Sequence, residues 1–103
     1  MINLTLLADV SVKQSLADTL RTLPEVERFI FTHVEEHSHQ LEQDPLLSER
    51  DKVVGYVPRI RVEILLDESA LSKVRNVLCK PEAGLAKRCR YWVTPVTESE
   101  GLL

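Results

Sequence analysis

Glycine is scarce in this chain, with three in 103 residues, at positions 55, 84 and 101. Phosphate-cradling loops use closely spaced glycines, because these let backbone N–H groups approach the ligand. No such cluster occurs here. Cysteine is scarcer still, with only Cys79 and Cys89. Two buried, reduced thiols are the expected state in the cytoplasm, and a disulfide or redox pair is the alternative.

Long apolar runs and excess positive charge are also missing. No segment approaches about 18 consecutive apolar residues, so we expect no direct membrane insertion. Residues 1–7 place no basic residue ahead of their apolar run, so no signal peptide is predicted and a cytoplasmic location is expected. The net charge of −3 argues against nucleic acid as a partner.

Hydrophobic periodicity predicts a single domain over residues 1–96, followed by a loose acidic tail, 97–103. Strands are expected at residues 2–9, 26–36, 53–66 and 89–96. Helices are expected over residues 12–23 and from about residue 69 to residue 80. The order βαββαβ predicts an α+β, ferredoxin-like fold, in which a four-stranded antiparallel sheet carries both helices on one face.

Both predicted helices have capping signals at their starts. Ser11 with Gln14 fits a capping box, in which the serine caps the helix and the glutamine reaches back. For the second helix, Ser69 or a neighbouring acid is the predicted cap. Its buried stripe is Leu71, Val74, Val77 and Leu78.

The third strand separates its apolar and charged residues cleanly. Its even positions 60–66 are apolar, while Arg59, Arg61 and Glu63 point to the other face. A strand of this kind normally belongs to an antiparallel sheet that is covered on one side only. The three charges are either a structural ladder, paired across strands or subunits, or contacts for an effector.

All three histidines lie within seven residues, at His33, His37 and His39, with Glu35 among them. If the strand stays extended, these four side chains share one face. Imidazoles with a carboxylate suit a zinc or copper ion, which makes the cluster a candidate metal site. The alternative is a solvated strand end that holds histidines by chance.

Residues 56–63, Tyr-Val-Pro-Arg-Ile-Arg-Val-Glu, resemble the third strand of the PII signalling proteins. Residues 31–34 resemble the end of a PII second strand, and the polar insert 37–51 lies where PII proteins carry their T-loop. The resemblance is to the PII-like superfamily, which includes the CutA-like proteins, and spans residues 2–96. It implies a homotrimer that binds small effectors in clefts between subunits. It also implies a protein partner, in some branches a membrane transporter.

The chain departs from the PII pattern before the fourth strand. PII proteins hold nucleotide phosphates there with a glycine-rich loop, but residues 84–90 keep only one glycine, Gly84. Arginines that PII proteins carry at the carboxyl terminus have no counterpart either. ATP binding of the standard kind is therefore not expected. Lys87, Arg88 and Arg90 form either an anion site or a solvated basic loop.

The sequence thus predicts a PII-like regulatory protein that binds a small effector and controls a protein partner. The candidate effector-binding residues are Arg59, Arg61, Glu63, Lys87, Arg88 and Arg90. The alternative is a CutA-like protein that binds divalent metal through His33, Glu35, His37 and His39. No nucleophile is paired with a base, so no enzymatic activity is predicted. Four aromatic residues are expected in the core or in trimer contacts: Phe29, Phe31, Tyr91 and Trp92.

Overall fold

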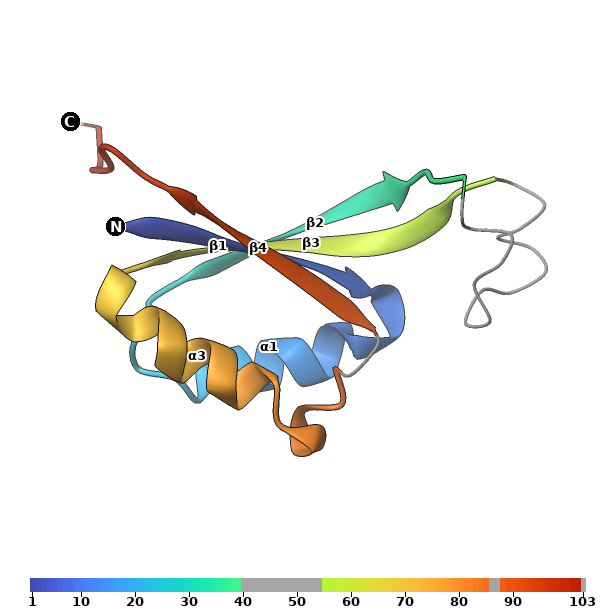
Figure 1. The fold of residues 1–103 in the computed structure, drawn as a ribbon, viewed down its shortest axis with the longest axis horizontal. Helices are drawn as coiled ribbons and strands as arrows, with labels where there is room; N and C mark the ends of the chain where they lie inside the picture. The colour runs from blue at the N-terminus through green and yellow to red at the C-terminus, as the bar shows by residue number, and fades with distance from the viewer. Residues whose placement is uncertain (40–54, 86–87, 103) are drawn as a thin grey trace.

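A computed structural model of the chain describes residues 1–39, 55–85 and 88–102. Four strands form one sheet in the order β2-β3-β1-β4, and every neighbouring pair is antiparallel. Both helices lie on the same side of this sheet (Figure 1). The predicted ferredoxin-like arrangement is therefore confirmed. The elements are β1 (Ile2–Asp9), α1 (Lys13–Arg21), β2 (Phe29–Glu36), β3 (Val57–Leu66), α3 (Leu71–Leu78) and β4 (Cys89–Pro95).

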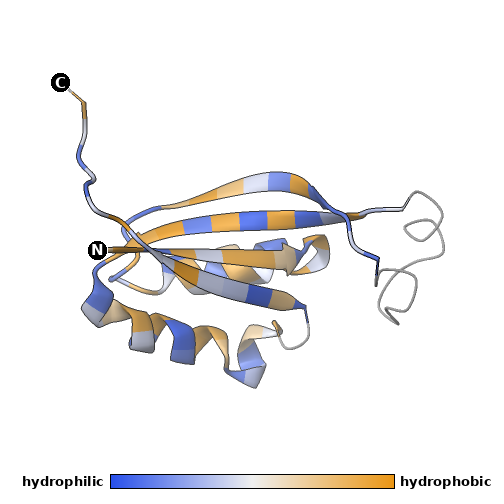
Figure 2. Cartoon of the chain, turned by 45° about the horizontal axis from the view of Figure 1, so that its top comes forward, coloured by the Kyte–Doolittle hydropathy of each residue, from blue (hydrophilic) through white to orange (hydrophobic). Residues whose placement is uncertain are grey.

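The core lies between the sheet and the two helices. Alternate residues of β1 and β3 point toward the helices, and Ile60, Val62 and Ile64 are completely buried there. They meet Leu16 and Leu20 of α1 and Val74 of α3, within one hydrophobic cluster. Figure 2 shows the result as hydrophobic and hydrophilic bands that alternate along β3. Hydrophobic residues recur at every second position of β3, and the same positions are the buried ones.

The start of α1 differs from the prediction. Ser11 lies inside a short 3-10 helix, Val10–Val12, and donates its backbone N–H to Asp9 Oδ1 at 2.9 Å. Gln14 donates to Asp18 at 2.9 Å instead of reaching back. The predicted capping box is therefore wrong, because Asp9 caps the 3-10 helix that leads into α1 and Ser11 lies inside that 3-10 helix. At the second helix the predicted neighbouring acid, Asp67, accepts from Ser69 N–H at 3.0 Å, but it caps the 3-10 helix Glu68–Ala70 that leads into α3.

Other boundaries are close to those predicted. β2 begins at Phe29 rather than at residue 26, and Val26 is buried in the loop before it. A 3-10 turn, Pro81–Ala83, ends at Gly84, whose φ of 72° is left-handed and favours glycine. Among the described residues, no helix is long and apolar enough to cross a membrane.

Candidate functional site

The face of the sheet opposite the helices, called the open face below, is formed by alternate residues of all four strands. The strand register places side chains from neighbouring strands in rows across it. Toward one end of the face, Ile30, Leu65 and Trp92 are 58%, 38% and 42% exposed. Toward the other end the side chains are mainly charged. These are Asp9 of β1, Glu36 of β2, Arg59 and Arg61 of β3, and Arg90 of β4.

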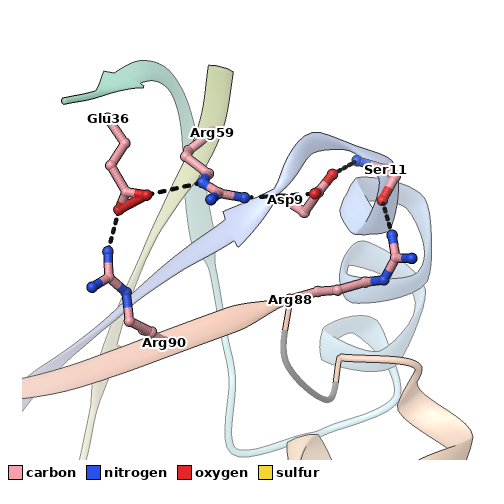
Figure 3. A network of polar contacts seen from close by, with 6 residues as sticks. All are labelled: Asp9, Ser11, Glu36, Arg59, Arg88 and Arg90. Carbon is pink, nitrogen blue, oxygen red and sulfur yellow. Dashed lines mark hydrogen bonds and ion pairs between the residues drawn. The ribbon is translucent and has the colours of Figure 1, made fainter. Parts of the chain in front are cut away.

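Arg59 is the centre of a polar network at this charged end (Figure 3). Its Nε donates to Glu36 Oε1 at 3.2 Å, and its Nη1 lies 3.5 Å from Asp9 Oδ2. The side chains of all three residues are mostly buried, with 13%, 14% and 21% exposed for Arg59, Glu36 and Asp9. The two carboxylates come from strands on either side of β3, so the ion pairs link three strands of the sheet.

Two further arginines reach the network from the start of β4. Arg90 pairs with the second oxygen of Glu36, although its side chain remains 70% exposed. Arg88 donates from Nη1 to the Ser11 hydroxyl at 3.0 Å, and its carbonyl accepts the Asp9 backbone N–H at 2.8 Å. The guanidinium groups of Arg59 and Arg90 thus share two carboxylates, while that of Arg88 joins the network through Ser11. With three arginines and two carboxylates, the network has an excess of one positive charge, and the guanidinium of Arg90 is exposed.

The environment of Asp9 favours the ionised carboxylate. Burial alone would raise the pKa of Asp9, but hydrogen bonds from the Ser11 backbone and hydroxyl, with the charges of Arg59 and Arg88, outweigh it. The pKa therefore lies below its ordinary value of 3.8. At neutral pH, Asp9 is a fixed anion that orients Arg59 from one side while Glu36 holds it from the other.

The structure brings three of the predicted effector-binding residues together: Arg59, Arg88 and Arg90. Arg61 and Glu63 lie outside this network and pair with each other at 3.4 Å, with their side chains 46% and 37% exposed. Lys87 lies outside the described residues, as do residues 40–51 of the predicted insert. The interpretation of Arg59 as part of a charge ladder across strands is confirmed by its two ion pairs.

Sequence reasoning missed Asp9, Ser11 and Glu36 as members of the network. An acid at the last position of a strand, two residues before a serine, was a signal for Asp9. Glu36 had no such signal, because its pairing depends on the β2–β3 register, which opposes Val34 to Arg59 and Glu36 to Val57. A one-residue shift would have placed Glu35 on the open face instead.

The predicted metal ligands are arranged in two separate contacts. His33 lies opposite the buried Ile60, and its Nε2 is 3.4 Å from Lys13 Nζ. His37 Nε2 lies 3.2 Å from Glu35 Oε1, and its ring contacts Tyr56 at a centroid distance of 5.5 Å. Within residues 1–39, 55–85 and 88–102, no three histidine, cysteine or acidic side chains are grouped to hold a metal ion. Metal binding by these residues and His39 stays a prediction that requires side chains to rearrange.

The cysteines are less buried than expected, and the four aromatic residues differ in their packing. Both cysteines are free thiols, but Cys79 is exposed because it directly follows the last turn of α3, while Cys89 is half-buried. Phe29 and Phe31 pack against the core with their rings 5.4 Å apart. Tyr91 and Trp92 are 46% and 42% exposed and do not belong to the core of a single chain.

Comparison with known proteins assigns the chain to a family. Residues 1–102 match DUF3240, described as a protein of unknown function. The chain belongs to the DUF3240 family. A crystal structure of a DUF3240 family protein from Shewanella baltica OS155 is similar, with a TM-score of 0.76 at 20% identity. The alignment covers 99% of this chain and 96% of that one. No curated protein matches the chain.

At 20% identity, the likeness to the Shewanella DUF3240 protein shows a shared fold and no more. The shared fold covers nearly the whole of both chains. Neither comparison names the PII-like superfamily. The resemblance of residues 56–63 to a PII strand stays a prediction.

Proposed function

We propose that this DUF3240 chain is a PII-like regulatory protein, which binds a small anionic effector in a cleft between subunits and controls a protein partner. The polar network around Arg59 carries the proposal. It combines a nearly buried cation, held by two carboxylates, with an exposed guanidinium at Arg90. Arginine donates in a planar fork that suits carboxylate and phosphate oxygens. The effector class is therefore a small phosphate or carboxylate.

The open face supports assembly with two further copies of the chain. Ile30, Leu65 and Trp92 expose apolar surface on one face, and burial of such surface is the main driving force of association. The half-exposed pair Arg61 and Glu63 offers both signs of charge, so a second copy can present the opposite charge to each. A homotrimer with closed symmetry would cover this face and form the clefts.

Glu36 connects effector binding to the segment that contacts the partner. It is the last residue of β2 and holds both Arg59 and Arg90. When an anion binds Arg90 in place of Glu36, Glu36 stays paired with Arg59 alone. The contacts at the end of β2 then change. The chain leads from there into the insert predicted to contact a partner. The effector then needs only to favour one of two arrangements of this strand end, and the partner, a transporter or another protein, binds that one.

A thermal-shift panel of nucleotides, inorganic phosphates, dicarboxylates and divalent metals tests the proposal. A ligand that binds only the folded state raises the apparent stability by RT ln(1 + [L]/Kd), about 2.7 kcal/mol at a hundred times Kd. We expect at least one anion to raise the melting temperature of the wild type. Arg90→Ala should abolish that rise, because Arg90 carries an exposed guanidinium that pairs with Glu36.

Arg21→Ala is the matched control, since Arg21 lies on α1 and pairs with Asp18 within the same helix. It should respond to the anion as the wild type does. Equal responses from Arg90→Ala and the wild type would remove the network as the effector site. A panel in which no anion has any effect would contradict the proposal itself.

Metal binding is the second candidate function, favoured by the contact between Glu35 and His37. Among the described residues, these two side chains are predicted ligands that lie in direct contact. Imidazole binds metal only when neutral, so zinc affinity should fall as pH drops through about 6.5. Equal zinc affinity of the wild type and a His37→Ala, His39→Ala double variant would exclude this candidate.

A further inference from the structure

Two thiols from different elements line one cavity on the helix side of the sheet. Cys79 directly follows α3, and its backbone N–H donates to the Arg75 carbonyl at 2.9 Å. Cys89 is the first residue of β4 and lies opposite Ala8 of β1. The cavity has a volume of about 220 Å³, and neither thiol belongs to the polar network on the other face.

The rest of the cavity wall is mostly apolar. Arg75 contributes the one guanidinium among the lining residues of the described structure. The remaining lining residues are Leu4, Leu6, Leu78, Leu85 and Tyr91. Leucine side chains exclude water and provide no oxygen ligands, so hard cations such as Mg²⁺ and Ca²⁺ have little to bind here.

We propose that this cavity binds a soft monovalent metal ion, Cu(I), between the sulfurs of Cys79 and Cys89. Thiolates are the side-chain ligands that favour Cu(I) over harder ions. Among the described residues, no third histidine, cysteine or acid joins the pair to form a larger metal-binding group. Two sulfurs alone suit a soft ion of low coordination number, whereas structural zinc takes four ligands.

The binding step balances in charge and protons without any oxidation. Each thiol loses one proton as its sulfur binds the ion, so two protons are released and the copper remains Cu(I). The resulting bis-thiolate complex carries one negative charge. Arg75 lines the same cavity and offsets that charge. Tyr91 serves as part of the wall.

Of the two thiols, Cys89 is the less reactive when no ion is bound. Burial, with a smaller contribution from Cys79, raises the pKa of Cys89 to about 11. The thiolate is the reactive form, so Cys89 resists alkylation and oxidation at neutral pH. A soft cation still binds, because its attraction for sulfur replaces the proton.

The test is an anaerobic titration of the reduced, full-length chain with Cu(I) against a chromogenic Cu(I) chelator, with native mass spectrometry for stoichiometry. We expect one ion per chain and the release of two protons. Since loss of a mere outer-shell partner weakens metal sites 10- to 100-fold, loss of a ligand in Cys79→Ser should weaken binding by at least about 100-fold. Arg75→Ala should weaken it by about tenfold.

Three controls keep the outcome decisive. Cys79 is exposed, so Cys79→Ser should fold normally, which circular dichroism checks, and Cys89→Ala then tests the second ligand. The His37→Ala, His39→Ala double variant should bind Cu(I) as the wild type does. Binding that survives in Cys79→Ser, or that is lost in the histidine variant, would overturn the site. So would a reduced wild type that takes no Cu(I), whether or not its thiols join as a disulfide in air.

Discussion

The two faces of the sheet stabilise the molecule in different ways. On the helix side, Ile60, Val62 and Ile64 are completely buried against α1 and α3. On the open face, the neighbouring Arg59 and Arg61 of the same strand carry charge, and only Arg59 is held by partners on both sides. The helix side therefore depends on close packing, which tolerates little change in volume. The open face depends on paired charges, which an anion or another subunit rearranges in the proposed function.

The largest expected effect on stability comes from a substitution in the packed face. Leu20 of α1 is completely buried, so Leu20→Ala should lower the free energy of unfolding by about 3 kcal/mol through lost transfer energy and a cavity. Urea denaturation measures the loss. The adjacent Arg21, with its side chain 65% exposed, is the control, and Arg21→Ala should cost less than about 0.5 kcal/mol. Similar losses in both variants would mean that Leu20 is not part of a packed core.

The next largest effect is a difference in stability loss between two arginine substitutions on the open face. Arg59→Ala leaves Asp9 and Glu36 as mostly buried carboxylates without their shared cation, which should cost on the order of 2 kcal/mol. Arg61, two residues further along β3, is 46% exposed, and Arg61→Ala should cost less than about 1 kcal/mol. Urea midpoints of the two variants give the comparison. If Arg61→Ala is the more damaging, the network around Arg59 does not stabilise the sheet.

Low pH should remove the contribution that Asp9, on the open face, makes to the free energy of unfolding. Because the pKa of Asp9 is depressed in the folded chain, its carboxylate stabilises the fold above the ordinary value of 3.8. That stabilisation is lost as the pH falls below 3.8 through the lower, folded-state pKa. The stability difference between the wild type and Asp9→Asn should therefore be constant above about pH 5 and shrink below it. Denaturation curves from about pH 7 to pH 3 test this, and a difference independent of pH would contradict it.

The smallest effect concerns the two thiols and changes no stability. Burial raises the pKa of Cys89 to about 11, whereas Cys79 is exposed. An alkylating reagent at neutral pH should therefore label Cys79 first, since thiolate and access both govern the rate. The labelling rate of Cys89 should rise about tenfold per pH unit toward its pKa. Peptide mapping by mass spectrometry measures both rates, and faster labelling of Cys89 would contradict its assigned burial.

The packed face was largely predictable from the sequence, because burial repeats with the period of each element. Alternation at positions 60–66 predicted the inner face of β3, and Leu16 with Leu20 predicted the inner face of α1. Local competition limited the accuracy at the ends. The Asp9 carboxylate displaced Ser11 as the cap, and Val26 became buried without joining a strand.

The open face was predictable only in part, because its contacts depend on strand register. The sequence indicated that Arg59 would pair across strands, and Arg88 and Arg90 were candidates for the same site. It gave no means to choose Glu36 over Glu35 as the partner of Arg59 and Arg90. Cys79 and Cys89 line one cavity, although one follows a helix and the other begins a strand, ten residues apart in sequence. No local sequence pattern predicts that they meet.

Light scattering on the purified chain tests the central claim most directly, since the proposed effector cleft lies between subunits that meet through the open face. The account predicts three times the chain mass of 11.8 kDa at micromolar concentration. It also predicts dissociation when a charge enters the apolar part of the open face, as in Ile30→Glu, while Val10→Glu, at an exposed apolar residue beyond the end of β1, leaves the mass unchanged. A wild-type mass of 11.8 kDa at every concentration would contradict the proposed trimer and its effector cleft.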